Sequence, residues 1–170
     1  MGCCNYRWTL FSVIEAKSVS QNPALPRDGH VAFGTPMIIR KAAGAADFNQ
    51  RLAAHILALR DADAERRAVS RSGIGGWRTG DDFLDDPAAV VTELRALAEA
   101  AVLEMLAMAK PGAVEGRITR LYGWANVNRA GDYNTIHSHP TSQWSGVYYA
   151  EIGENDPSRP LSGVIESRTP

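Results

Sequence analysis

The chain has 170 residues, of which 45% are hydrophobic and 22% are charged. This composition is typical of a globular protein with one hydrophobic core and excludes a disordered chain. The formal net charge of −1 leaves no excess of basic residues for nucleic acid or for an anionic membrane, so we expect neither partner. A small molecule or a peptide is the favoured substrate class.

Residues 1–30 are predicted to be a loosely held extension, because they contain many turn formers and no clear hydrophobic period. The apolar run TLFSVI is too short for a signal-peptide core or a membrane span, which predicts a cytoplasmic protein. The main domain is then expected to occupy residues 31–170. Its first run, VAFGTPMIIR, is interrupted by Pro36 and suits an edge strand.

Two helices are predicted within residues 45–112. The first carries an apolar stripe at spacings of four, four and three residues: Phe48, Leu52, Ile56 and Leu59. After a glycine-rich loop around Trp77, the pair Asp86–Pro87 predicts the start of the second helix. Its core stripe is Val90, Val91, Leu94, Leu97, Ala101, Val102, Met105 and Leu106, and the sequence KPG ends it.

From residue 117 to residue 170 the hydrophobic period changes to two, which predicts strands. The sequence RITRLYGWANVN alternates small or apolar residues with larger and polar ones, and YNTIHSH, WSGVYYAE and LSGVIE are predicted as three further strands. Helices followed by antiparallel strands indicate an α+β fold, with the N-terminal helices packed on the sheet.

The segment YNTIHSH contains the most chemically specific pattern of the chain. On a strand, His137 and His139 would project to the same side, and imidazoles in that position can reach one ion of iron, zinc, copper or nickel. A lone His-x-His pair is more often exposed or hydrogen-bonded within the protein. Here, however, six of the thirteen aromatic residues fall between Tyr122 and Tyr149, interleaved with asparagines. Aromatic side chains with a few polar groups are typical of a small-molecule pocket.

The sequence GWANVNRAGDYNTIHSHPTSQWSGVYYAEIG resembles the signature of the bacterial iron(II)/2-oxoglutarate-dependent oxygenases. Trp-x-Asn, Gly-x-x-Asn, His-x-His-Pro and Ser-Gly-x-Tyr-Tyr follow one another in the order of that family, and FGTPMII and GWRTGDDFL match its upstream landmarks. The resemblance covers residues 31–168 and is most specific in residues 122–149.

The resemblance implies a double-stranded β-helix, or jelly roll, that binds Fe(II) and 2-oxoglutarate. Such enzymes convert 2-oxoglutarate to succinate and hydroxylate a C–H bond. By the same resemblance His137 is the first iron ligand. His139 stands where related enzymes have a carboxylate ligand, so it is either a nitrogen ligand or a neighbour of the site. Asn126, Asn134 and Tyr148 are expected to line the cosubstrate pocket.

The sequence departs from the family after His139. No histidine follows this residue, and only Arg159 and Arg168 remain as arginines, whereas the family has a distal histidine ligand and an arginine for 2-oxoglutarate. If Pro170 is the biological end, we expect an inactive protein or a binding remnant. About four strands cannot close a jelly roll of about eight, so the unpaired edges predict a chain that is partly open around WSGVYY, forms a homo-oligomer or is poorly soluble.

A second family pattern fits part of the same segment. The spacing from Gly131 to His137 and His139 resembles the opening of the cupin metal motif, which would imply a different metal-binding protein on a similar barrel. Cupins have a glutamate three or four residues after the second histidine, where this chain has Gln143 and Trp144. The order of the motifs therefore favours the oxygenase interpretation.

Overall fold

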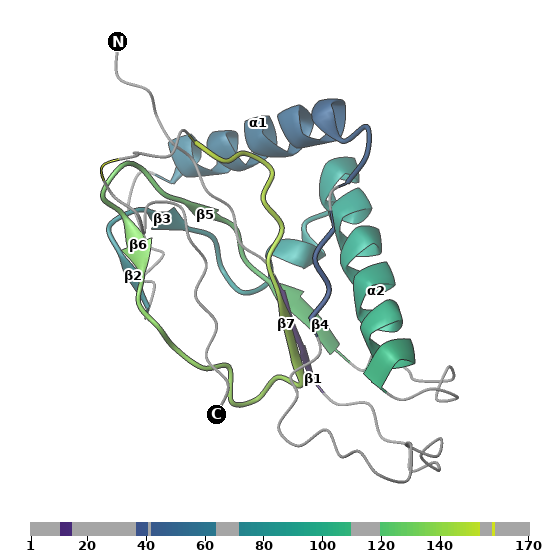
Figure 1. The fold of residues 1–170 in the computed structure, drawn as a ribbon. Coiled ribbons are helices and arrows are strands. Elements are labelled where there is room, and N and C mark those ends of the chain that lie inside the picture. Colours follow the sequence, from purple (N-terminus) through teal and green to yellow (C-terminus); the bar gives the residue numbers. More distant parts are fainter. Residues whose placement is uncertain are drawn as a thin grey trace, which may run out of the picture.

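A computed structural model describes residues 11–14, 37–40, 42–63, 72–109, 120–153 and 158. This part of the chain combines helices with small antiparallel strand pairs, a mixed α+β architecture (Figure 1). The helices are α1 (Ala46–Ala62) and α2 (Ala89–Ala109), with a short 3-10 helix at Phe83–Asp85. The strands are β1 (Phe11–Ile14), β2 (Gly73–Ile74), β3 (Trp77–Arg78), β4 (Arg120–Gly123), β5 (Asn126–Val127), β6 (Tyr133–Asn134) and β7 (Trp144–Gly146).

The strands form one sheet of three and two separate pairs. In the larger sheet β1 lies between β4 and β7 and runs antiparallel to both. β2 pairs with β6, and β3 pairs with β5. In Figure 1, α1 crosses the top of the molecule and α2 lies beside the three-stranded sheet, with the two small pairs on the opposite side from α2.

Both predicted helices are confirmed, because their apolar stripes form the core. Leu52 and Ile56 on α1 are 1% exposed and Val91 on α2 is fully buried. Two members of the predicted stripe are wrong: Ala101 is exposed, and the side chain of Leu97 is 46% exposed, whereas Leu94, one turn earlier, is 8% exposed. The apolar surface of α2 is broader than its buried face, so periodicity alone assigned Leu97 to the core.

Asp86 connects the two helices. Its Oδ1 accepts a hydrogen bond of 2.8 Å from the backbone N–H of Ala88, just before α2 begins. Its Oδ2 lies 3.0 Å from Nε2 of His55 on α1. Burial raises the pKa of this carboxyl, but the bonds from Ala88 and His55 outweigh burial and leave the pKa below its ordinary value. The predicted helix start at Asp86–Pro87 is confirmed, and Asp86 satisfies one of the orphan N–H groups there.

The extension predicted for residues 1–30 contains a strand of the larger sheet. Phe11 pairs with Gly123 of β4 and with Gly146 of β7, so β1 is the middle strand. The sequence did not predict this strand, because four residues are too few to show a period of two. The strand depends on partners far away in the sequence. The division of the chain at residue 31 stays a prediction.

The C-terminal strands are confirmed in part. The alternation predicted a strand with two different faces. Leu121, Gly123, Ala125 and Val127 are all buried, but Asn126 of the other face is buried as well, and the chain forms two short strands, β4 and β5, in place of one. The strand predicted in WSGVYYAE covers only Trp144–Gly146. The predicted LSGVIE strand lies outside the described residues, and so do residues 31–36 of the predicted edge strand. Residues 37–40 have no regular secondary structure. The closed jelly roll stays a prediction.

The glycine-rich loop forms β2 and β3, joined by Gly75 and Gly76. Both glycines have a positive φ, 72° and 69°, which other residues rarely adopt. A Cβ added to Gly76 would lie 2.4 Å from Oδ1 of Asn128 and 3.1 Å from the carbonyl oxygen of Val127. Gly76 is therefore required here, because the turn between β2 and β3 lies too close to Val127 and Asn128 for a larger residue. No helix among the described residues is both long and apolar enough to cross a membrane.

Candidate metal centre

His137 and His139 lie just after β6, in a segment without regular secondary structure. The prediction that both stand on a strand is therefore wrong. β6 ends at Asn134 because its partner β2 has only two residues, although the N–H of Thr135 still donates to the carbonyl oxygen of Ser72 at 2.7 Å. The two imidazoles nevertheless lie together, with ring centroids 4.8 Å apart and planes at 71°.

A hydrogen bond selects the tautomer of His137. Its Nδ1 lies 2.7 Å from the carbonyl oxygen of Thr135. A carbonyl oxygen can only accept, so Nδ1 carries the proton and donates it. In the neutral ring Nε2 then keeps its lone pair, which is the form that binds a metal ion. His137 is exposed, so this nitrogen is accessible to an ion from solvent.

His139 is more buried than His137, and its surroundings favour the neutral imidazole. Burial lowers the pKa of His139, and the positive charges of His137 and Arg78 lower it further. A neutral ring offers a lone pair to a metal. Its ring packs on the indole of Trp124, with centroids 5.6 Å apart. Both imidazoles are thus suited to act as nitrogen donors.

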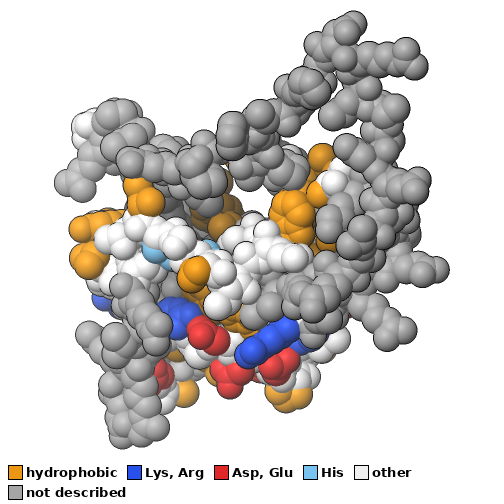
Figure 2. All heavy atoms as spheres, turned by 90° about the horizontal axis from the view of Figure 1, so that it is seen from below, with side chains coloured by type: hydrophobic (Ala, Val, Ile, Leu, Met, Phe, Trp, Pro, Cys, Tyr) orange, Lys and Arg blue, Asp and Glu red, His pale blue; other side chains and the backbone are white. Residues whose placement is uncertain are grey.

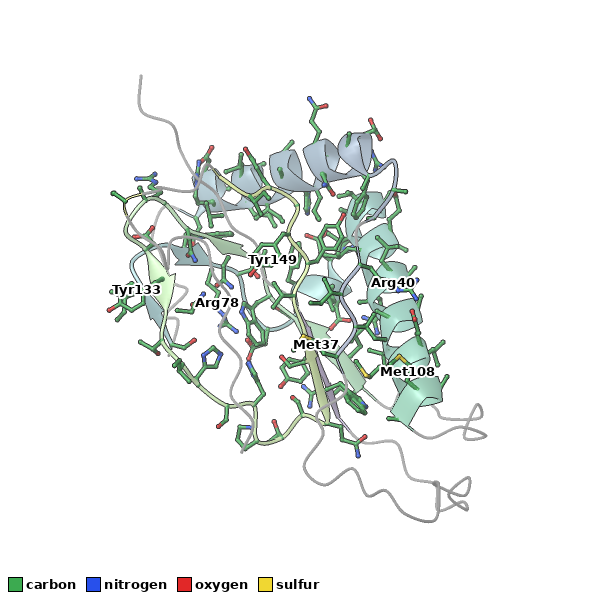
Figure 3. All side chains as sticks on the ribbon, in the orientation of Figure 1. Met37, Arg40, Arg78, Met108, Tyr133 and Tyr149 are labelled. Carbon is green, nitrogen blue, oxygen red and sulfur yellow. The ribbon has the colours of Figure 1, made fainter. Side chains whose placement is uncertain are left out.

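A row of aromatic and cationic side chains continues from His139. Trp124 contacts Tyr122 at 6.2 Å between ring centroids, and the hydroxyl groups of Tyr122 and Ser142 are 2.9 Å apart. The guanidinium carbon of Arg78 stands 4.4 Å from the centre of the Trp124 ring, and that of Arg120 stands 5.5 Å from the centre of the Tyr122 ring. In Figure 3, Arg78 lies between the β2–β6 pair and the larger sheet, whereas Tyr133 points outward.

Arg78 is the residue of this neighbourhood that sequence reasoning missed. It precedes Trp124 by 46 residues in the chain (124 − 78), and no local pattern links the two. Its position follows from the antiparallel pairing of β3 with β5, in which Arg78 is opposite Asn126. The only signal in the sequence was the GWRTG landmark, which identified the segment but not a role for the arginine.

The three residues expected to line a cosubstrate pocket are spread over the structure. Asn126 is 4% exposed, on β5. Asn134 is exposed on β6, opposite Gly73. The hydroxyl of Tyr148 donates to Oδ1 of Asn49 on α1 at 2.5 Å, and its ring packs edge-on against Phe48 at 5.8 Å. These contacts connect Tyr148 to helix α1, and its pocket-lining role stays a prediction.

Within the described part of the chain, the two histidines have no third donor that would complete a three-residue iron site. Among the described residues, no group of three or more His, Cys, Asp or Glu side chains is placed to hold one ion. The fit to Fe(II) therefore extends to two imidazole donors. Figure 2 shows histidine side chains reaching one face of the molecule between hydrophobic and uncharged side chains, with positive and negative groups mixed nearby.

Comparison with known families finds a match over the segment that contains the two histidines. Residues 122–166 match the family described as "Putative 2OG-Fe(II) oxygenase". The matched segment contains the last two residues of β4, the whole of β5, β6 and β7, both histidines and Trp124. It spans 45 of the 170 residues (166 − 122 + 1). No curated protein and no solved structure gives a significant match.

Proposed function

We propose that this chain is an oxygenase-like domain that binds Fe(II) through His137 and His139 and uses 2-oxoglutarate as its cosubstrate. The observation that carries the proposal is the pair of imidazoles 4.8 Å apart inside the segment that matches the oxygenase family. When bound, iron and 2-oxoglutarate would supply the oxidising chemistry for hydroxylation of a C–H bond.

The chain's own residues would hold the ion and select the state of its ligands. The carbonyl oxygen of Thr135 accepts a hydrogen bond from the protonated Nδ1 of His137, so the lone pair of Nε2 can coordinate a metal ion. His139 packs on Trp124 and is partly buried. Burial lowers its pKa, which favours the neutral imidazole as a nitrogen donor. Two neutral nitrogen donors suit a divalent ion of the first transition series. A third protein ligand would strengthen the site, and with two imidazoles we expect weak, exchangeable binding.

Metal titration tests the proposal most directly. Co(II), a spectroscopic substitute for Fe(II), should bind saturably to the 170-residue chain, and the variants H137Q and H139Q should each lose that binding. H55Q is the matched control, because His55 contacts Asp86 and neither His137 nor His139. It is expected to change stability without changing affinity for Co(II). Equal binding by the wild type and by a double H137Q/H139Q variant would contradict the proposal.

The cosubstrate gives a second test. If 2-oxoglutarate binds beside the ion, it should raise the affinity for Co(II), and Co(II) should raise the affinity for 2-oxoglutarate by the same factor. Glutarate, which lacks the keto group, is the control and should have a smaller effect. Succinate formation with Fe(II), oxygen and 2-oxoglutarate would then report turnover. A metal-binding protein of another kind would bind Co(II) with no dependence on 2-oxoglutarate.

A further inference from the structure

The orientation of His139 depends on packing in a way that the orientation of His137 does not. The ring of His137 is held by its bond to Thr135, whereas no hydrogen bond to the ring of His139 occurs among the described residues. An imidazole without a hydrogen bond has a broad preference about its second side-chain torsion. The ring contacts of His139 with Trp124 at 5.6 Å and with His137 at 4.8 Å therefore define its plane.

Trp124 is itself held by a residue from another strand. The guanidinium carbon of Arg78 lies 4.4 Å from the centre of the indole ring, close enough for a favourable cation–π contact. Arginine stacks well on an aromatic ring because its guanidinium is planar and weakly hydrated. The order of contacts is Arg78, Trp124, His139 and His137.

Arg78 is held both at its backbone and at its guanidinium. Its backbone belongs to β3, and the next residue, Thr79, exchanges two hydrogen bonds with Ala125: N–H to carbonyl oxygen at 3.0 Å and Ala125 N–H to Oγ1 at 2.9 Å. Its guanidinium forms an ion pair with Asp81, and its side chain is only 18% exposed. Such a held cation can fix its neighbours, whereas an exposed arginine would sample many rotamers.

We propose that Arg78 and Trp124 are positioning residues for His139, which set the plane of its imidazole against that of His137. The effect of this orientation on metal affinity rests on the proposed function, because it requires that His139 binds a metal ion. The orientation itself is a property of the metal-free protein. In metal sites, groups that orient a ligand typically change metal affinity about 10- to 100-fold when they are removed.

The first measurement uses the metal-free chain. The side-chain proton resonances of His139, assigned with H139Q, should carry a ring-current shift from Trp124. R78M and W124F should move these resonances, and R78K, which keeps the cation, should restore part of the wild-type position. Arg120→Met is the matched control, because Arg120 stacks on Tyr122 and not on Trp124, and it should leave the resonances in place. Unchanged His139 resonances in both R78M and W124F would overturn the proposal.

The second measurement separates this proposal from the proposed function. Co(II) affinity should fall about tenfold or more in R78M, with thermal unfolding and amide dispersion recorded to verify the fold. If the wild type binds no Co(II) while R78M still shifts His139, the metal function fails and the positioning role stands. If the wild type binds Co(II) and R78M and W124F bind it equally well with an unaltered Co(II) spectrum, the positioning role fails and the metal function stands.

Discussion

Nδ1 of His137 donates a hydrogen bond of 2.7 Å to the carbonyl oxygen of Thr135, two residues earlier in the chain. Because the acceptor belongs to the backbone, substitution of the Thr135 side chain leaves it in place. The protonated nitrogen is thus set by the local path of the chain after β6, before any metal arrives.

The hydrogen-bond partners of His137 and His55 predict which ring nitrogen of each carries the proton. In a long-range ¹H–¹⁵N spectrum of the neutral imidazoles, His137 should show a protonated Nδ1 and an Nε2 that carries a lone pair. His55 is the internal control and should show the opposite tautomer, because its Nε2 lies 3.0 Å from the carboxylate of Asp86. A protonated Nε2 on neutral His137 would contradict the role given to Thr135.

Two leucines one turn apart on α2 should differ strongly in their contribution to stability. Leu94 is 8% exposed and Leu97 is 46% exposed. We expect L94A to lower the free energy of unfolding by about 2–4 kcal/mol through loss of burial and formation of a cavity. L97A should lower the free energy of unfolding by less than about 1 kcal/mol, because much of the Leu97 side chain is exposed to solvent. Urea denaturation of both variants measures the difference, and equal costs would mean that Leu97 is covered in solution.

Asp86 should make stability depend on pH in the acid range. Its pKa in the folded state is below its ordinary value, so the ionised form is favoured by folding. The resulting stabilisation is present above the unfolded-state pKa of about 3.9 and is lost as pH falls through the folded-state pKa. In D86A this part of the pH dependence should vanish, with a cost near neutral pH of about 1 kcal/mol from the lost bond to Ala88.

D86N separates the two bonds of that carboxyl. The amide oxygen of Asn can still accept the N–H of Ala88, but it carries no charge for His55. D86N should therefore cost less than D86A near neutral pH and show the same flat response in acid. Thermal unfolding between about pH 3 and pH 7 measures both. An acid response in D86N equal to that of the wild type would assign the effect to another carboxyl.

Tyr148 tests whether a residue expected at a cosubstrate pocket is a structural contact. Y148F removes the hydroxyl that donates to Asn49, and we expect a loss of about 0.5–1.5 kcal/mol in the free energy of unfolding. Y133F is the control, because Tyr133 is 55% exposed on β6. Co(II) affinity is measured with and without 2-oxoglutarate in Y148F and in the wild type, and an equal 2-oxoglutarate effect in both would make Tyr148 a structural contact only. A loss of the 2-oxoglutarate effect in Y148F would place this hydroxyl at the pocket.

The same tyrosine predicts a response to alkaline pH. Burial raises the pKa of Tyr148 above its ordinary value. Its contribution to stability is present below the unfolded-state pKa of about 10 and is lost as pH rises through the folded-state value. The wild type should therefore lose stability above about pH 10 more steeply than Y148F does. Denaturation curves at a series of alkaline pH values compare the two slopes.

Local sequence patterns predicted the helices and the presence of strands in residues 121–127, because those signals repeat within a few residues. They did not predict β1, whose four residues gain their structure from β4 and β7. They also extended the histidine strand too far, since its length depends on the two-residue partner β2. Arg78 was missed for the same reason. A contact made across 46 residues (124 − 78) leaves no trace in the period of either segment.

The central place of β1 has a consequence for how the protein is made. Phe11 pairs with Gly123, 112 residues later (123 − 11). At a synthesis rate of about 5–20 residues per second, β1 leaves the ribosome roughly 6–20 s before its first partner is complete. During that interval both backbone edges of an apolar strand are open to pairing with other chains. The backbone edges of β1 are therefore exposed from the time when β1 leaves the ribosome until β4 and β7 have been translated.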